Sequence, residues 1–320
     1  MAVYTEIADE EVAGFVAQYD IGRVIACKGI AEGIENTNYL LVTESGTFIL
    51  TLYEKRVRPA DLPFFLALMN HLAGRGFPCP TPVPGRDGEM LRSVAGRAAA
   101  IVTFLNGMWP RRPAVAHCAE LGGAMARMHL AAADFPGRRE NDLSVKGWRP
   151  LYEATLRRGH SLALELRREL EEELIALEAA WPASLPRGTI HADLFPDNVF
   201  FEGERLSGVI DFYFACTDFL AYDLAVCLNA WCFEVDGSFN VTKARRLVQA
   251  YRGVRELGAD ELDALPLLAR GAAMRFLLTR LYDWLNTPKT AMVTRKNPME
   301  YLQKMRFHRG IRSFGGYGLD

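Results

Sequence analysis

Four residues of this 320-residue chain have types and spacing that could do chemistry together: His191, Asp193, Asn198 and Asp211. A positioned carboxylate can orient an attacking hydroxyl group and accept its proton. Amide and carboxylate oxygens are the ligands that Mg²⁺ prefers in proteins. Asp193 suits the first task, and Asn198 and Asp211 suit the second. The set therefore predicts phosphoryl transfer from a magnesium-bound nucleotide to a hydroxyl group.

The elements that must position these residues are two short strands. Residues 199–201 and 206–210 are apolar and are joined by the turn-like residues 202–205, which predicts a hairpin. That hairpin would bring Asn198 and Asp211 together. An ordinary turn would explain His191 and Asp193 alone, and an ordinary strand end would explain Asp211 alone. Both halves, in order and at hairpin spacing, favour a functional site.

The spacing is similar to the protein-kinase catalytic loop, H-R-D-x-x-x-x-N followed by D-F-G, with Ala192 and Tyr213 replacing Arg and Gly. A metal-binding His-x-Asp pair in a hydrolase is an alternative interpretation. The remaining histidines are dispersed, however, and are expected to be helix or surface residues: His71, His117, His129, His160 and His308. We therefore interpret His191 as an architectural residue of the loop.

Length and composition restrict the class of protein. The chain is long enough for roughly two domains, and half of its residues are hydrophobic. A net charge of −2 gives no support for nucleic acid or an anionic membrane as a partner. No apolar run approaches the ~18 residues of a membrane span. The acidic start and six cysteines without a C-x-x-C pair, of which Cys118, Cys216 and Cys227 are expected to be buried thiols, predict a cytoplasmic protein.

Hydrophobic periodicity predicts an α+β protein with two lobes. Residues 1–104 should form a small β-rich, nucleotide-binding lobe with strands at 22–28, 38–43, 47–53, 88–92 and 97–104 and helices at 5–19 and 59–75. Residues 105–320 should form a large, mainly helical catalytic lobe with helices at 114–132, 161–180, 218–233, 242–251, 260–285 and 299–307. A small antiparallel β lobe followed by a large helical lobe is a protein-kinase-like plan.

The loop between the first two strands could hold nucleotide phosphates, because backbone N–H groups near Gly29 and Gly33 can bind anions. Asn36, Thr37 and Asn38 could add side-chain groups. An ordinary hairpin loop explains these glycines equally well. Thr51 stands where a kinase strand carries its phosphate-binding Lys, and the helix over 60–75 has no Glu to pair with one. Which basic residue replaces that Lys is left open among Lys28, Lys55 and Arg56.

The motif His191-x-Asp193-x-x-x-x-Asn198 with Ile210-Asp211-Phe212 resembles the aminoglycoside phosphotransferase and choline kinase-like superfamily over nearly the whole chain. Residues 33–39, 48–54, 191–198 and 218–225 are most similar to its homoserine kinase branch, in which Thr at the strand position looks normal. The resemblance implies ATP and Mg²⁺ as cofactors, Asp193 as the catalytic base, and Asn198 and Asp211 as magnesium ligands. It also implies that Asp223 supports His191, and that backbone groups of Phe104, Leu105 and Asn106 bind adenine.

The acceptor implied by this branch is an amino-acid alcohol, L-homoserine, whose carboxylate and ammonium groups need a cation and an anion. The late helix offers Arg275, Arg280 and Asp283, with Arg275 the better candidate for the carboxylate. Arg280 and Asp283 could instead simply pair with each other. Trp231 and Trp284 keep a choline-like cation open as substrate. A methylthioribose or aminoglycoside kinase and a catalytically silent nucleotide-binding protein are further candidates; the oligomeric state is not predicted.

Overall fold

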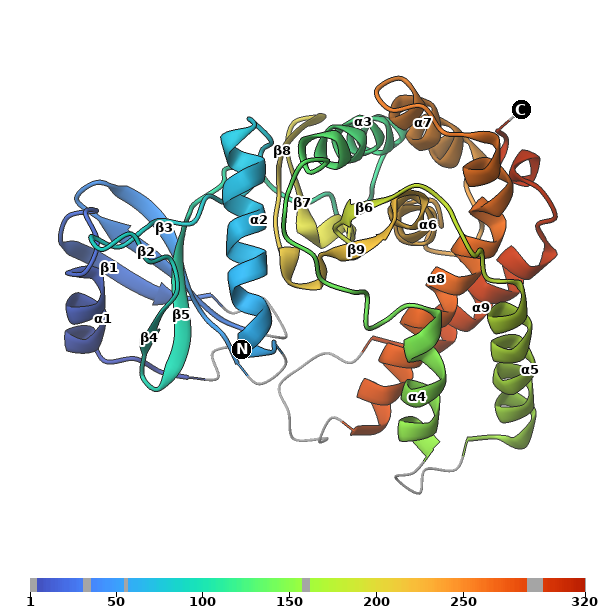
Figure 1. Cartoon of the computed structure of the whole chain (residues 1–320), viewed down its shortest axis with the longest axis horizontal. Coiled ribbons are helices and arrows are strands. Elements are labelled where there is room, and N and C mark those ends of the chain that lie inside the picture. Colours follow the sequence, from blue (N-terminus) through green and yellow to red (C-terminus); the bar gives the residue numbers. More distant parts are fainter. Residues whose placement is uncertain (1–4, 31–35, 55–56, 157–161, 287–295, 320) are drawn as a thin grey trace. The chain divides into compact units, whose positions relative to one another are not determined.

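The computed structural model describes residues 5–30, 36–54, 57–156, 162–286 and 296–319. Two compact units make up the chain (Figure 1). The smaller unit contains Met1–Gly107, Asp134–Gly137 and Ser207–Tyr213, and the larger unit contains Met108–Ala133, Arg138–Leu206 and Phe214–Asp320. A mixed architecture with an antiparallel sheet and a large helical part confirms the predicted fold class. The assignment of residues 1–104 and 105–320 to a nucleotide-binding and a catalytic lobe stays a prediction.

The smaller unit is built on a five-stranded antiparallel sheet with strand order β1-β2-β3-β5-β4. Its strands are β1 (Val24–Gly29), β2 (Thr37–Thr43), β3 (Gly46–Leu52), β4 (Arg92–Val94) and β5 (Arg97–Thr103). Two helices accompany the sheet, α1 (Asp9–Val16) and α2 (Leu62–Gly74). Thr43 pairs with Gly46, so β2 and β3 are joined by the expected tight turn.

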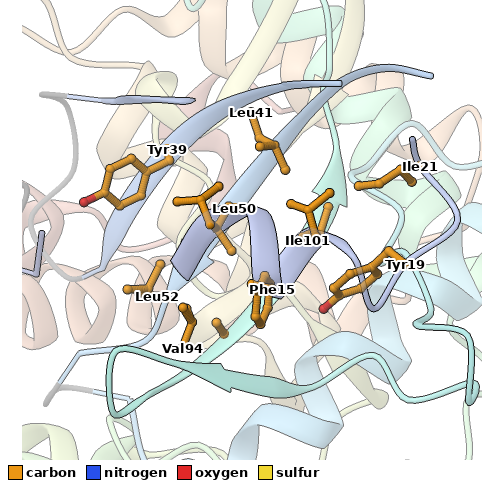
Figure 2. Close-up of a cluster of buried hydrophobic side chains, with 12 residues drawn as sticks. Phe15, Tyr19, Ile21, Tyr39, Leu41, Leu50, Leu52, Val94 and Ile101 are labelled. Atoms are coloured by element: carbon orange, nitrogen blue, oxygen red, sulfur yellow. The ribbon is translucent and has the colours of Figure 1, made fainter. Parts of the chain in front are cut away.

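The core of the smaller unit lies between α1 and one face of the sheet (Figure 2). Strand β2 alternates buried and half-buried residues, and its buried Leu41 packs with Leu50 and Ile101 of the neighbouring strands. Phe15 of α1 covers them. Burying one such side chain contributes about 1.5–3 kcal/mol, so this cluster is sufficient to hold α1 on the sheet.

The larger unit is mainly helical. Its helices are α3 (Val115–Ala131), α4 (Val145–Leu156), α5 (Leu164–Ala180), α6 (Leu220–Trp231), α7 (Val241–Arg252), α8 (Ala259–Asn286) and α9 (Pro298–Gly310). The long helix α8 packs against α4, α5, α6 and α9. Figure 1 shows α6 end-on near α3 and α8, both of which it contacts. Helices α3 and α7 approach closely at Gly122, where a Cβ atom would lie 2.0 Å from the Leu247 carbonyl oxygen.

Two short strands position the predicted catalytic loop in the larger unit. Strand β6 (Arg187–Ile190) pairs antiparallel with β9 (Cys216–Phe219), and Ile190 lies opposite Cys216. Because β9 leads directly into α6, the residues that follow β6 emerge beside the start of α6. The strands expected on either side of residues 202–205 occur as β7 (Val199–Glu202) and β8 (Arg205–Val209), which form a two-stranded sheet.

Several elements expected from the sequence are wrong. No strand covers 88–91: the Gly88 N–H closes a turn on the Gly85 carbonyl oxygen, residues 89–91 are irregular, and β4 begins at Arg92. The helix expected at 5–19 is α1, which covers only Asp9–Val16 with Ala8 as its N-cap, and the Thr5 hydroxyl before it donates to Glu54 at 2.7 Å. Asp218 belongs to β9 rather than to the following helix, since β9 obtains its hydrogen bonds from β6. Helix α4 is not expected from the sequence because it contains Pro150.

The six cysteines are all free thiols, and Cys118, Cys216 and Cys227 are buried as expected. In the described ranges, no helix combines the length and the apolar character needed to cross a membrane.

Candidate active site

The catalytic loop predicted around Asp193 lies between β6 and β7 in the larger unit. A short 3-10 turn, Pro196–Asn198, folds the chain back so that the Asn198 side chain reaches Asp193. The Asn198 Nδ2 atom donates to the Asp193 backbone oxygen at 2.8 Å and to its Oδ2 atom at 3.2 Å. This explains the five-residue spacing of the motif. Because its nitrogen is engaged with Asp193, the Asn198 amide orients its oxygen away from that carboxylate.

Two residues of the predicted motifs have a left-handed backbone conformation, Ala192 with φ 63° and Asp211 with φ 64°. Among the described non-glycine residues, Ala95 in the β4–β5 turn is the third with positive φ. Such a conformation costs of order 1–3 kcal/mol and persists only where surrounding contacts impose it. The catalytic loop is therefore held in place against a local preference.

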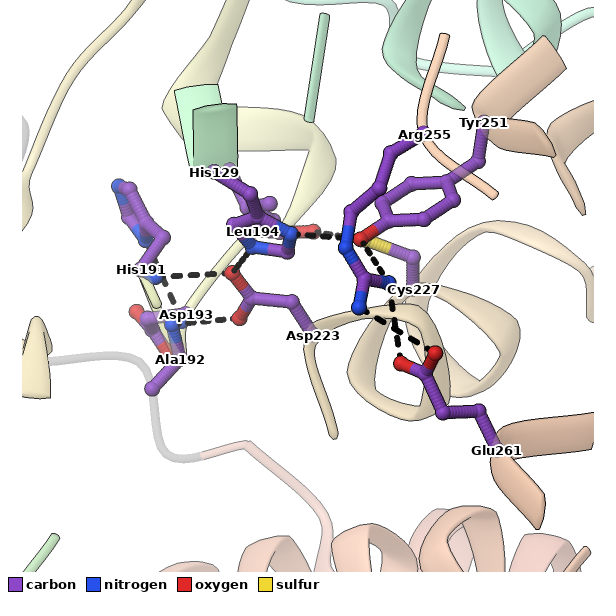
Figure 3. Close-up of polar contacts among 10 residues, drawn as sticks. All are labelled: His129, His191, Ala192, Asp193, Leu194, Asp223, Cys227, Tyr251, Arg255 and Glu261. Carbon is purple, nitrogen blue, oxygen red and sulfur yellow. Dashed lines mark hydrogen bonds and ion pairs between the residues drawn. The ribbon is translucent and has the colours of Figure 1, made fainter. Parts of the chain in front are cut away.

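The contacts that hold the loop come from Asp223 on α6 (Figure 3). Its Oδ2 atom accepts the backbone N–H of His191 at 2.8 Å, and its Oδ1 atom accepts that of Ala192 at 2.7 Å. The His191 Nδ1 atom in turn accepts the Asp193 N–H at 3.2 Å. Burial alone would raise the pKa of Asp223, but hydrogen bonds from His129 and His191 hold that pKa below its usual value. The predicted pairing of Asp223 with this loop thus includes the main chain of His191.

His129 on α3 is a part of the site that sequence reasoning missed. Its Nε2 atom lies 3.0 Å from Asp223 Oδ2, and its Nδ1 atom lies 2.8 Å from the Tyr251 hydroxyl. The chain of contacts continues through Arg255, which donates to the Tyr251 hydroxyl and to Glu261 (Figure 3). The sequence predicts a helix or surface residue, and His129 is a helix residue whose side chain is buried. The signal that could have found it is its position four residues after Met125, on the apolar face of α3.

The Asp193 carboxylate has an unusual electrostatic environment. Burial raises the pKa of Asp193 to about 6, although Arg275 and Lys296 lower it, while Asp197 raises it. The Lys296 Nζ atom lies 3.6 Å from Asp197 Oδ2, so these two surface charges partly offset each other. A pKa near 6 leaves Asp193 mostly ionised at neutral pH yet basic enough to accept a proton.

Arg275 is the predicted substrate residue that the structure places at the catalytic loop. It is almost fully buried in α8, its Nη1 atom donates to the Ala192 carbonyl oxygen, and its Nη2 atom lies 4.0 Å from Asp193 Oδ1. The guanidinium carbon also lies 4.4 Å from the centroid of the Phe276 ring. Arg275 therefore supports the strained residue of the loop and the carboxylate next to it.

The two remaining predicted substrate residues lie further along α8. The Arg280 Nη1 atom pairs with Glu300 Oε2 of α9 at 2.6 Å, and its guanidinium carbon lies 4.3 Å from the Tyr301 ring centroid. Asp283 is half-buried on the following turn. Glu300 is thus an ion-pair partner of Arg280. The sequence alone had also allowed a pair between Arg280 and Asp283.

The two tryptophans considered for a choline-like substrate differ in their exposure to solvent. Trp231 is buried and donates through Nε1 to the Leu194 carbonyl oxygen at 2.7 Å, so it supports the catalytic loop from α6. Trp284 is 41% exposed at the end of α8.

The smaller unit contains the predicted nucleotide residues. Gly29 ends β1, whereas Gly33 lies outside the described residues. The Asn36 Oδ1 atom accepts the Glu54 N–H at 3.3 Å, and the Thr37 hydroxyl donates to the Glu54 carboxylate at 2.9 Å. The Thr51 hydroxyl donates to Asn38 Oδ1 at 2.8 Å, so this Thr bonds to the neighbouring strand at the position where a kinase has Lys.

The predicted adenine-binding segment follows β5 in the same unit. Phe104 is 43% exposed, the Leu105 side chain lies against Gly208, and the Asn106 carbonyl oxygen accepts the Ser207 hydroxyl at 2.8 Å. Asp211 also belongs to the smaller unit, whereas Asp193 and Asn198 belong to the larger unit. Asp211 contributes to raising the pKa of Tyr213, for which burial is the larger cause.

Comparison with known proteins identifies the family to which the chain is similar. The family model described as "Phosphotransferase enzyme family" matches residues 26–257. The chain is 65% identical to the homoserine kinases of Paramagnetospirillum magneticum and Rhodospirillum rubrum, over 100% of this chain and of each relative.

Solved structures with the same fold have much lower identity. Choline kinase from Cryptosporidium parvum has a TM-score of 0.70 at 15% identity and covers 94% of both chains. Amicoumacin kinase, solved in complex with AMP-PNP, Ca²⁺ and Ami, has a TM-score of 0.67 at 16% identity, covering 95% of this chain and 92% of that chain.

Proposed function

Because the chain belongs to the phosphotransferase enzyme family, as its motifs had indicated, we propose that it transfers the γ-phosphoryl group of ATP to L-homoserine. The product is O-phospho-L-homoserine, an intermediate of threonine biosynthesis. The observation that carries the proposal is the 58–65% identity to homoserine kinases along the whole chain. The Asp193 loop supplies the chemistry that this activity needs.

Asp193 is the group that we assign to the reacting hydroxyl. The substrate oxygen attacks the γ-phosphorus atom in line with the bond to the β-phosphate oxygen, that bond breaks, and ADP leaves. The hydroxyl proton passes to the Asp193 carboxylate. The Asn198 Nδ2 atom donates to one oxygen of the Asp193 carboxylate, and Arg275 Nη2 lies 4.0 Å from the other oxygen. Holding the substrate hydroxyl and the Asp193 carboxylate in the right geometry lowers the barrier to the attack on the γ-phosphorus atom.

We assign Mg²⁺ to Asn198 and Asp211. Their side-chain oxygens are the hard donors that Mg²⁺ selects, and the Asn198 amide is oriented with its nitrogen toward Asp193. When bound, the ion would neutralise charge on the nucleotide phosphates. Removal of divalent cations with a chelator should abolish turnover, and added Mg²⁺ should restore it.

We assign the nucleotide to the smaller unit. Gly29, Gly33 and the side chains of Asn36, Thr37 and Asn38 are candidates for the phosphates, and residues 104–106 are candidates for adenine. The contacts of Thr37 and Asn38 with Glu54 and Thr51 would hold this segment in place around the nucleotide.

We assign the substrate to α8, with Arg275 binding the carboxylate of homoserine. Arg280 and Asp283 stay candidates for its charged groups. Residues 105–320 would then carry catalysis and substrate binding, residues 1–104 would carry the nucleotide, and the free buried thiols are consistent with a reducing cytoplasm.

The competing functions fit less well. Aminoglycosides are polycations and would need an acidic cleft, whereas Arg275 and Lys296 flank Asp193. A silent nucleotide-binding protein would have no reason to keep all three of Asp193, Asn198 and Asp211. Among the described residues, no group of three or more His, Cys, Asp or Glu side chains could hold a metal, as a transition-metal hydrolase requires.

A coupled ADP-release assay tests the proposal directly. Purified protein with ATP and Mg²⁺ is given L-homoserine, choline, methylthioribose or an aminoglycoside. Turnover confined to homoserine is expected. Turnover with another alcohol alone would reject the substrate, and ATP binding without any turnover would favour the silent protein.

A further inference from the structure

One face of the sheet in the smaller unit carries hydroxyl groups, while the opposite face carries the core under α1. Leu50 and Leu52 of β3 point into that core (Figure 2). Because side chains alternate along a strand, Thr51 and Tyr53 point to the other face. Tyr53 lies just beyond β3 but continues its ladder, since its N–H donates to the Ala98 carbonyl oxygen at 2.8 Å. The two hydroxyl groups therefore share the face that is turned away from α1.

Tyr53 joins this face to the segment that follows the proposed metal ligand Asp211. Its hydroxyl oxygen lies 3.2 Å from that of Tyr213, in a hydrogen bond in which either group can donate. The two rings also meet edge to face, with their centroids 5.3 Å apart. Phe65 of α2 meets the Tyr213 ring edge to face as well, at 5.7 Å. All four residues belong to the smaller unit, so Tyr213 is held there by both the sheet and α2.

Asp211 needs such support because its backbone is left-handed, with φ 64°. An aspartate in that conformation persists only where surrounding contacts impose it. Tyr213 lies two residues further along, in the short 3-10 turn Phe212–Phe214, so holding its side chain limits the rotation of the backbone at Asp211. The hydroxyl group that holds it belongs to a residue 160 positions away in the chain. The Tyr213 side chain therefore contributes to the orientation of the Asp211 carboxylate.

In a protein kinase, an ion pair between a Lys on the corresponding strand and a Glu on a helix must be in place together with the metal-binding Asp. In this chain Thr51 takes the position of that Lys, and its hydroxyl donates to Asn38. Helix α2 contains no Glu and packs Phe65 against Tyr213. A strand, a helix and the segment of the metal ligand are therefore connected here by uncharged groups.

We propose that Tyr53 and Tyr213 are positioning residues that orient Asp211 for Mg²⁺, in place of the Lys–Glu pair of a protein kinase. This inference rests on the proposed function, in which Asp211 is a magnesium ligand, and it adds two residues to that function. Neither tyrosine has to contact the metal, because each acts through Asp211.

The test is Tyr213→Phe, which removes one oxygen atom and keeps both ring contacts. Calorimetry with ADP, in the presence of Mg²⁺ and in the presence of a chelator, measures the metal-dependent part of the nucleotide affinity without turnover. The Mg²⁺-dependent gain in ADP affinity should fall about threefold to tenfold, because the lost orientation is worth up to one uncharged hydrogen bond. The ADP affinity without metal should be unchanged. Tyr53→Phe should have the same two effects.

The double variant Tyr53→Phe/Tyr213→Phe tests whether the bond between the two hydroxyl groups is responsible. The double variant should lose no more of the Mg²⁺-dependent gain than either single variant, because each of the three variants lacks the same bond. Losses that add up in the double variant would overturn the proposal, since each tyrosine would then act independently of the other.

Tyr152→Phe is the matched control. Tyr152 is buried in α4 of the larger unit, and its hydroxyl donates to the Arg167 carbonyl oxygen, also at 3.2 Å. Its replacement should leave the Mg²⁺-dependent gain in ADP affinity unchanged. A loss as large as that of Tyr213→Phe would assign the effect to general stability and overturn the proposal.

The failures are distinguishable. If the wild type phosphorylates homoserine and Tyr213→Phe keeps the full Mg²⁺-dependent gain, the inference is overturned and the proposed function stands. An equal loss of ADP affinity with and without metal would also overturn it, because Tyr213 would then support the nucleotide site as a whole. If the wild type does not phosphorylate homoserine but Tyr213→Phe loses the Mg²⁺-dependent gain, the acceptor is rejected and the role of the tyrosine is supported. A wild-type ADP affinity that is independent of Mg²⁺ would overturn both the metal assignment and the inference.

Discussion

The Nε2 atom of His129 lies 3.0 Å from the Oδ2 atom of Asp223, and neither side chain is exposed to solvent. The same Asp223 carboxylate accepts the backbone N–H groups at the start of the catalytic loop, where Ala192 is held in a left-handed conformation. One buried carboxylate thus connects α3 and α6 to the residue before Asp193. His129 fixes the carboxylate, and the carboxylate fixes the loop.

Replacing His129 with Ala should lower kcat at least tenfold and the free energy of unfolding by about 1–3 kcal/mol, because Asp223 loses a buried partner. Tyr251→Phe removes the hydrogen bonds of the Tyr251 hydroxyl with His129 Nδ1 and Arg255 but leaves His129 on Asp223, so it should have a clearly smaller effect on both quantities. Steady-state kinetics and urea unfolding measure the two effects. A His129→Ala enzyme with wild-type kcat would exclude a positioning role.

Asp193→Asn should lower kcat by about 10²–10⁴-fold, since an amide cannot accept the hydroxyl proton. The affinity for ATP, measured by calorimetry, should change little. Asp197→Asn is the control, because Asp197 is an exposed carboxylate four residues further along the same loop. Equal losses of activity in both variants would indicate a general charge effect and not a base.

Arg275→Lys should lower kcat as well as raise the KM for homoserine, because an ammonium group cannot serve the Ala192 carbonyl oxygen and a substrate group with separate fixed donors. Arg270→Lys on the same helix is the comparison, since Arg270 pairs with Glu173 of α5. Full kinetic analysis with both substrates separates the effects. An unchanged kcat in Arg275→Lys would show that Arg275 acts on substrate binding alone.

His308 predicts a pH dependence of stability. Burial, together with the smaller effect of the Lys304 charge, lowers the pKa of His308 from 6.5 to about 3. Between pH 6.5 and about 3, His308 therefore binds a proton in the unfolded chain but not in the folded protein. The free energy of unfolding should fall as the pH is lowered from 6.5 toward 3, by up to roughly 5 kcal/mol from this group. His308→Phe should lose this part of the slope in urea titrations at several pH values; an unchanged slope would contradict the assignment.

The sequence alone was sufficient for features that depend on local spacing. The five-residue spacing between Asp193 and Asn198 is typical of a short loop, and the structure forms that loop with a 3-10 turn at Pro196–Asn198. The strands on either side of residues 202–205 and most helices were likewise predicted, because alternation and helical periodicity are properties of contiguous residues. The same patterns also predicted the kinase-like fold class.

Tertiary structure decided the features that depend on residues far apart in the chain. Strand β9 exists because β6 supplies its hydrogen bonds, and its four residues contain no pattern of their own. His129 reaches Asp223 only because α3 packs beside α6. Tyr301 of α9 lies against Phe276 of α8 only because the two helices pack together. Residue types and spacing thus predicted the chemistry, whereas long-range packing decided which side chains support the loop of Asp193.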